Sequence, residues 1–142
     1  MTNNYTTPWK IGDVEINKRI VLAPMAGISN KAFLSLAKEF GAGLVVTEMI
    51  SDKGIEHRNT KTLSMLDFDG IPNPLSIQIF GGDIDSMRES AIISASVGPD
   101  LIDINYGCPV KQVACRGAGA ALLQDIPKMV EMTSEIVKIA SR

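Results

Sequence analysis

Aromatic residues, cysteines and an excess of charge of one sign are all scarce in this chain of 142 residues. Aromatics make up 5% of it, there are 2 cysteines, and 14 Lys and Arg stand against 16 Asp and Glu. A free-standing nucleic-acid module usually has a strongly basic balance, so the total charge does not predict one, although a local basic patch is compatible with it. Disorder is excluded, because 45% of the residues are hydrophobic and 21% are charged.

Signals for export, membrane insertion and metal binding are also missing. No uncharged apolar run approaches the roughly 18 residues of a membrane span, and residues 1–5 show neither a basic nor an apolar targeting region. Cys108 and Cys115 form no CxxC pair, so we expect free thiols. We interpret the only histidine, His57, as a solvated loop residue. The sequence thus predicts a cytoplasmic protein with no membrane segment and no metal site.

What the chain does contain is an alternation of apolar runs and segments with helical spacing. The strand-like runs are 20–23, 44–47, 75–80 and 101–104. Helices are predicted over 31–40, after an Asp83 cap, and after an Asp125 cap. Segment 51–73 is interpreted as a polar helix plus a loop. Residues 9–16 alternate around a Gly-Asp pair and predict a hairpin that caps the bottom of a barrel.

The helical spacing also predicts which side chains are buried. In the first helix these are Phe33, Leu36, Ala37 and Phe40. In the second they are Ile84, Met87, Ala91 and Ala95. In the last they are Ile126, Met129, Val130, Thr133, Ile136, Val137 and Ala140.

Repeated strand–helix units imply an α/β protein with a parallel sheet and helices packed outside it. One such architecture is an open doubly wound sheet, and the other is a (β/α)₈ barrel. The Gly-rich fingerprint that a dinucleotide-binding sheet carries after its first strand is absent. This absence favours a TIM (β/α)₈ barrel, of which residues 1–142, with about four βα units, would be the N-terminal half.

In both architectures ligands bind at the carboxyl ends of the strands. Those ends read Pro-Met-Ala-Gly at 24–27, Thr-Glu-Met at 47–49, Gln78 with Phe-Gly-Gly at 80–82, and Asn-Tyr-Gly-Cys-Pro at 105–109. Each carries small, flexible or polar groups, so all four could share one pocket. Glu48 is interpreted as a satisfied polar residue outside the catalytic set.

Four segments together resemble the tRNA-dihydrouridine synthases, closest to the bacterial B-type group. They are Ala-Pro-Met-Ala-Gly at 23–27, Val-Thr-Glu-Met at 46–49, Gln-Ile-Phe-Gly at 78–81 and Asp-Ile-Asn-Tyr-Gly-Cys-Pro-Val at 103–110. The Asn-x-Gly-Cys-Pro element is the most specific, whereas related flavin barrels share the first segment. The resemblance covers about residues 11–142. It implies an FMN enzyme that uses NADPH to reduce uridine to 5,6-dihydrouridine in tRNA.

The resemblance also implies roles for single residues. Cys108 matches the catalytic cysteine, and Asn105 matches an asparagine near the uracil edge. The residues that match flavin contacts are Pro24, Met25, Ala26 and Gln78. Lys111 and Arg116 flank the Cys108 loop and are candidates for phosphate contacts with the RNA. Cys115 matches no catalytic position.

The chemistry of the reaction agrees with these roles. Saturating the C5–C6 bond of uracil needs a hydride at one carbon and a proton at the other. The resemblance implies that reduced flavin gives the hydride to C6 and that Cys108 protonates C5. A cysteine thiol ordinarily has a pKa near 8.5, so it carries a proton at neutral pH. A stacked uracil must also flip out of the RNA to reach a flavin.

Two alternatives remain open at this point. One is another FMN barrel, such as a dihydroorotate dehydrogenase or an ene-reductase, which shares the first motif but does not explain the element around Cys108. The other is a non-catalytic half-barrel fragment. By resemblance, residues 1–142 are a partial catalytic domain that lacks the C-terminal half-barrel and a helical RNA-binding domain. We therefore expect the isolated chain to be inactive, to bind FMN weakly and to self-associate.

Overall fold

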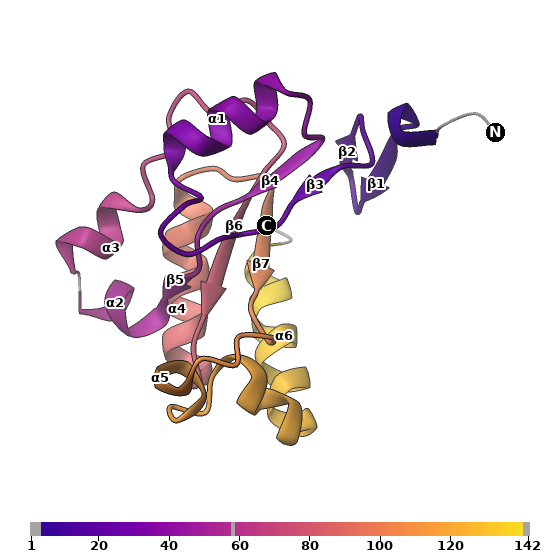
Figure 1. The fold of residues 1–142 in the computed structure, drawn as a ribbon. Coiled ribbons are helices and arrows are strands. Elements are labelled where there is room, and N and C mark those ends of the chain that lie inside the picture. Colours follow the sequence, from indigo (N-terminus) through magenta and orange to yellow (C-terminus); the bar gives the residue numbers. More distant parts are fainter. Residues whose placement is uncertain (1–3, 58, 141–142) are drawn as a thin grey trace.

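A parallel sheet of consecutive strands forms the centre of the computed structural model, which describes residues 4–57 and 59–140 (Figure 1). The strands are β3 (Val21–Leu22), β4 (Leu44–Val46), β5 (Ile50–Ser51), β6 (Leu75–Phe80) and β7 (Leu101–Ile104). Both β4 and β5 pair with β6, at its beginning and its end, and β7 pairs with residues 76–79 of the same strand. β4 and β5 therefore lie on one side of β6 as two parts of one interrupted strand, with β3 beyond β4.

The interruption between β4 and β5 is a β-bulge. Val46 pairs with Ser76, and Ile50 pairs with Ile79. The β4–β5 strand thus advances by four residues while β6 advances by three, which inserts one extra residue. The second predicted strand therefore does not end at 47–49, as expected, but resumes at Ile50.

The bulge reverses the alternation of side chains along this strand. Val45 shares a buried cluster with Leu34 of the first helix, and Ile50 shares one with Met87 of a later helix. An odd-numbered and an even-numbered residue can face the same helix layer only because one residue has been inserted between them. Met49 consequently faces the opposite side of the sheet, where it borders the same cavity as Gln78.

Three long helices cover one face of the sheet. They are α1 (Lys31–Glu39), α4 (Ile84–Ser96) and α6 (Ile126–Ala140). Each begins where a side-chain oxygen accepts a backbone N–H: Asn30 from Phe33, Asp83 from Ser86, and Asp125 from Lys128. The predicted caps at Asp83 and Asp125 are confirmed. Figure 1 shows α4 beside β6 and α6 beside β7.

The hydrophobic core lies between this helix layer and the sheet. Ile77 and Ile79 of β6 belong to a cluster with Met87 of α4 and Met132 of α6, and all four are fully buried. Leu75, on the same face of β6, belongs to a second cluster under α1. All three helices therefore pack on one face, whereas an open doubly wound sheet has helices on both. The arrangement is consistent with a segment of a (β/α)₈ barrel.

The predicted buried faces of α1 and α6 are partly wrong. In α1 the buried residue is Leu34, while Leu36 and Phe40 are exposed. In α6 the buried residues are Met132 and Ile136. Ile126, Val130 and Val137, predicted to be buried, are exposed. Each helix carries two apolar stripes, and only the one that faces the sheet is covered.

The segment 51–73 is more structured and more apolar than predicted. It forms two short helices, α2 (Asp52–Glu56) and α3 (Thr60–Ser64), instead of one polar helix. Ile55, Leu66 and Ile71 from this segment are buried in the core. His57 caps the end of α2 and is exposed, as predicted.

The remaining elements lie near the two ends of the chain. β1 (Trp9–Ile11) pairs antiparallel with β2 (Val14–Ile16), and η1 (Asn4–Thr6) precedes them. After β7 come α5 (Lys111–Ala114) and η2 (Gly119–Gln124), which lead into α6. No helix in the described ranges is long and apolar enough to cross a membrane.

Candidate functional site

A cavity of about 480 Å³ lies among the carboxyl ends of the strands. The residues that line it are Pro24, Ala26, Met49, Gln78, Ile104, Asn105, Tyr106, Gly107, Cys108 and Val110. Five of these are residues that the sequence analysis assigned to the site: Pro24, Ala26, Gln78, Asn105 and Cys108. The structure thus brings together residues from β6 and from the ends of three strands.

Asn105 shapes the loop that presents Cys108 to this cavity. Its side-chain oxygen accepts hydrogen bonds from the backbone N–H groups of Gly107, at 3.0 Å, and of Cys108, at 2.9 Å. A side chain that bonds its own backbone two and three residues on replaces the bonds that a regular turn would make. The Cys108 carbonyl accepts a further bond from the Ala120 N–H at 3.0 Å. The backbone N–H and the carbonyl of Cys108 are therefore both hydrogen-bonded, and its partly exposed side chain borders the cavity.

Asn105 is itself held by the Gln78 amide, which is held in turn by the Asp103 carboxylate. Its amide nitrogen donates to Gln78 Oε1 at 3.0 Å, and Gln78 Nε2 donates to Asp103 Oδ2 at 2.5 Å. The carboxylate accepts only, which fixes the orientation of the Gln78 amide and through it that of Asn105. Gln78 is 7% exposed and still has one amide hydrogen and one oxygen lone pair to offer a ligand.

The hydroxyl of Thr47, in the bulge, bonds the backbone of Gln78. It accepts the Gln78 backbone N–H at 3.1 Å and donates to the Glu48 carbonyl at 2.9 Å. Thr47 is 1% exposed, so an apolar residue here would leave a buried N–H without a partner. The bulge therefore keeps its hydrogen bonds although the regular ladder is interrupted.

The loop after β3 forms another wall of the cavity. The Met25 N–H donates to Ser29 Oγ at 2.9 Å, and the Gly27 N–H donates to Glu48 Oε2 at 2.6 Å. Among the described residues, no hydrogen bond of the Ala26 N–H is found. Ala26 also lines the cavity, so its amide is the one that this loop can offer to a ligand.

Three residues assigned from the sequence do not line this cavity. The backbone N–H and carbonyl of Met25 are both engaged in hydrogen bonds within its own loop. Lys111 is exposed at the start of α5. Arg116 lines a separate cavity of about 240 Å³, together with Asp52 and Asp83. Cys115 is exposed and lies outside the site.

The sequence analysis left Met49 and Tyr106 without a role, although both line the cavity. The Tyr106 hydroxyl bonds Thr133 Oγ1 at 2.8 Å, which anchors the loop after β7 to α6. Met49 and Tyr106 both lie within the strand-end motifs, so their position in the sequence could have identified them as lining residues. In the described part of the chain, no group of three His, Cys, Asp or Glu side chains could hold a metal ion.

The fold and the site define a parallel α/β protein whose strand ends surround one thiol and two side-chain amides. A model of the dihydrouridine synthase (Dus) family matches residues 21–141. The chain therefore belongs to the dihydrouridine synthase family.

Several curated relatives support this assignment. The chain is 38% identical to tRNA-dihydrouridine synthase B of Pseudomonas aeruginosa over 129 residues, which cover 91% of this chain and 39% of the relative. It is 42% identical to the enzyme of the same name from Pseudomonas syringae over 117 residues, or 82% of this chain and 34% of the relative. A probable tRNA-dihydrouridine synthase of Rickettsia prowazekii is 35% identical over 136 residues, or 92% and 41%. The chain spans about two fifths of the length of these relatives.

Proposed function

We propose that this chain carries the flavin- and uracil-facing part of an enzyme that reduces uridine to 5,6-dihydrouridine in tRNA. The observation that carries the proposal is the single cavity that joins Cys108, Asn105 and Gln78 at the strand ends. Family membership supports the reaction class. NADPH as the reductant, which the resemblance implies, and a cytoplasmic location are part of the same proposal.

The cavity suits a flat heteroaromatic ring such as that of FMN. Its volume lies within the roughly 300–1,000 Å³ of ligand pockets, and its lining is mostly apolar with a few polar groups. The unpartnered Ala26 N–H and the remaining donor of Gln78 are available to the oxygens and nitrogens of such a ring. When bound, reduced FMN would supply the hydride.

Cys108 would supply the proton, because its sulfur borders the cavity and its loop is held in place from both sides. Asn105 contributes by fixing that loop, since its oxygen is already engaged by two backbone N–H groups. Its role is thus to orient the acid, and any contact with the uracil edge would come from its amide side.

We also propose that the sheet is the N-terminal half of a (β/α)₈ barrel. The strands follow one another in chain order, all are parallel, and their helices cover one face. The hairpin of β1 and β2 precedes the first barrel strand, where it would close the bottom of the barrel. A complete enzyme would then join this chain to a second half-barrel and an RNA-binding domain that binds the tRNA and presents a flipped uridine.

The experiment that tests this function compares Cys108→Ala with Cys115→Ala in such a complete enzyme. We expect C108A to abolish dihydrouridine formation, measured by mass spectrometry of tRNA nucleosides, while NADPH still reduces the flavin. C115A is the matched control and should keep the wild-type yield. A wild-type dihydrouridine yield in C108A would exclude the acid role. Turnover of dihydroorotate or of a small enone, with none on tRNA, would favour another FMN barrel.

A further inference from the structure

Glu48 connects two walls of the candidate site. Its carboxylate oxygen Oε2 accepts the Gly27 N–H at 2.6 Å, across 21 positions of sequence. Gly27 has a φ of +75°, a conformation that glycine adopts readily and that side chains rarely do. The bond therefore ties the loop after β3 to the bulge between β4 and β5.

The loop after β3 is otherwise closed upon itself. The Met25 carbonyl accepts the N–H groups of Ile28, at 3.0 Å, and Ser29, at 2.9 Å, and Ser29 Oγ returns a bond to the Met25 N–H. These bonds set the internal shape of the loop but not its position relative to the neighbouring strand. The bond to Glu48 supplies that position.

The bulge explains why Glu48 can reach this loop. Because one residue is inserted, Met49 borders the cavity with Gln78 while Ile50 returns to the helix layer. Glu48 lies next to Met49, at the point where the strand leaves its ladder. The Glu48 side chain reaches toward the loop that follows β3 and not into the hydrophobic core. It is only partly buried.

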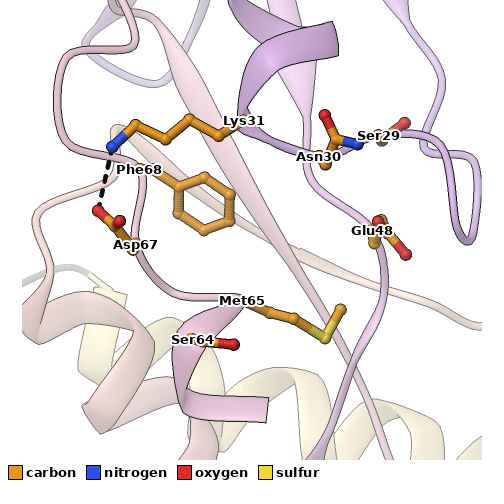
Figure 2. Close-up of a pocket in the computed structure, with 8 residues that line it drawn as sticks. All are labelled: Ser29, Asn30, Lys31, Glu48, Ser64, Met65, Asp67 and Phe68. Atoms are coloured by element: carbon orange, nitrogen blue, oxygen red, sulfur yellow. Dashed lines mark hydrogen bonds and ion pairs between the residues drawn. The ribbon is translucent and has the colours of Figure 1, made fainter. Parts of the chain in front are cut away.

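A second cavity, of about 240 Å³, lies on the far side of Glu48. Figure 2 shows Glu48 on the same side of this cavity as Ser29 and Asn30, with Phe68 across the cavity from it. Lys31 extends the other way and pairs with Asp67 at 3.2 Å. The nearby lysine is therefore engaged elsewhere, and the carboxylate of Glu48 remains directed at the backbone of Gly27.

We propose that Glu48 is a positioning residue, whose bond to Gly27 sets the distance of the loop 24–27 from the cavity and thereby the placement of the bound flavin ring. Pro24 and Ala26 of this loop line the cavity, so a shift of the loop changes the width of the site. A hydrogen bond to a carboxylate is among the stronger kinds in proteins. The inference rests on the proposed function, because it assigns the cavity to the flavin.

The test uses Glu48→Ala and Glu48→Gln in the complete enzyme, with Glu131→Ala as the control. Glu131 is an exposed glutamate of α6, remote from the loop in the fold. We expect E48A to weaken FMN binding about tenfold in a fluorescence titration, the effect of losing one charged hydrogen bond. Hydrogen exchange of the peptide that contains Gly27 should accelerate. E48Q keeps an acceptor oxygen and should recover most of both properties, and E131A should match the wild type.

A merely structural role is distinguished by where the effect appears. We expect E48A to change the FMN affinity and the exchange at Gly27 while leaving exchange in the core strand β6 unchanged. Wild-type FMN affinity and wild-type exchange at Gly27 in E48A would overturn the proposal. If E48A does not fold, unchanged affinity and exchange in Glu48→Asp, whose carboxylate is one carbon further back, would overturn it equally. Failure of the wild-type enzyme to bind FMN would instead refute the proposed function, and the exchange at Gly27 would still decide the role of Glu48.

Discussion

The loop that carries Cys108 is held on one side by the Asn105 side chain and on the other by a close backbone approach that Gly119 allows. The Cys108 carbonyl lies so near that a side-chain carbon added at Gly119 would be 2.6 Å from it. Gly119 also has a φ of +56°, which L side chains rarely adopt. The close approach lets the Ala120 N–H reach the Cys108 carbonyl. Gly119, fifteen residues after the end of β7, thus helps to set the position of the thiol.

We expect Gly119→Ala to lower the free energy of unfolding by about 2–4 kcal/mol, from left-handed strain together with the clash at Cys108. Gly117→Ala is the matched control, because Gly117 has a φ of +68° in the same loop but nothing within 4 Å of the added carbon. It should cost only about 1–2 kcal/mol. Urea unfolding of the two variants measures the difference. Equal losses of unfolding free energy would show that the close approach to the Cys108 carbonyl does not exclude a side chain at position 119.

At this scale the sequence predicted that residues at the strand ends lie together, but not the hydrogen bonds around them. Pro24, Gln78, Asn105 and Cys108 share one cavity because strand ends converge in a parallel sheet, while their roles toward flavin and uracil stay predictions. The bonds of Gln78 to Asp103 and Asn105 were not predictable, since they depend on the register of β6 and β7. Lys111 and Arg116 remain a prediction for RNA phosphates, because nothing in the cavity tests it.

At the scale of elements, each long helix begins at a capping side chain that also bears on its stability. The Ser86 backbone N–H, which bonds the Asp83 carboxylate at 3.0 Å, holds the pKa of Asp83 below its usual value. A carboxyl whose pKa is depressed in the folded state stabilises the fold above its unfolded pKa of about 3.9. This contribution disappears as the pH falls through the folded pKa.

We therefore expect Asp83→Ala to lower the free energy of unfolding by about 1 kcal/mol at pH 7. The difference from the wild type should shrink below pH ~4, where the wild-type carboxyl becomes protonated. Asp83→Asn is the control, since asparagine caps a helix nearly as well but does not titrate. Thermal unfolding from pH 2 to 7 measures all three proteins. A constant gap between wild type and D83A at every pH would contradict the assignment of the cap to the ionised carboxylate.

The errors of the sequence analysis also belong to this scale. Periodicity identified α1 and α6 but chose the outer apolar stripe for part of each, because spacing alone does not say which stripe meets the sheet. The bulge after Val46 was invisible, since Thr-Glu-Met has no turn residue that marks an inserted position. The buried residues of 51–73 were missed because they are scattered among polar residues, in α2 and in the loop after α3.

The whole molecule leaves apolar side chains exposed at both flanks of the sheet. On the β3 side Phe40 is 86% exposed and Ile20 54%. On the β7 side Val130 is 61% exposed and Val137 52%. In a closed barrel these positions lie where neighbouring βα units pack. The exposed flanks therefore support the half-barrel that we propose, and they are the reason to expect the 142-residue chain to associate.

We expect the isolated 142-residue chain to self-associate at micromolar concentration and to bind FMN weakly. Sedimentation velocity should show a weight-average mass that rises with concentration. Replacing Phe40, Val130 and Val137 with serine should shift the population toward monomer. Ile92→Ser is the control, because Ile92 is 53% exposed on α4, in the middle of the helix layer and away from both flanks. A monomer that forms a tight one-to-one complex with FMN would contradict this prediction.

The bulge between β4 and β5 makes the number of residues in this stretch as important as their identity. Shortening it by one residue would remove the bulge and restore regular alternation, so Ile50 would still face the helices. One of the two residues left between Val46 and Ile50 would then face the core, and the irregular backbone from which Glu48 reaches Gly27 would be lost. Substitutions at 47–49 can be compensated one at a time, but a change in length cannot. Variation in this family should therefore avoid insertions and deletions here, even where the three side chains differ.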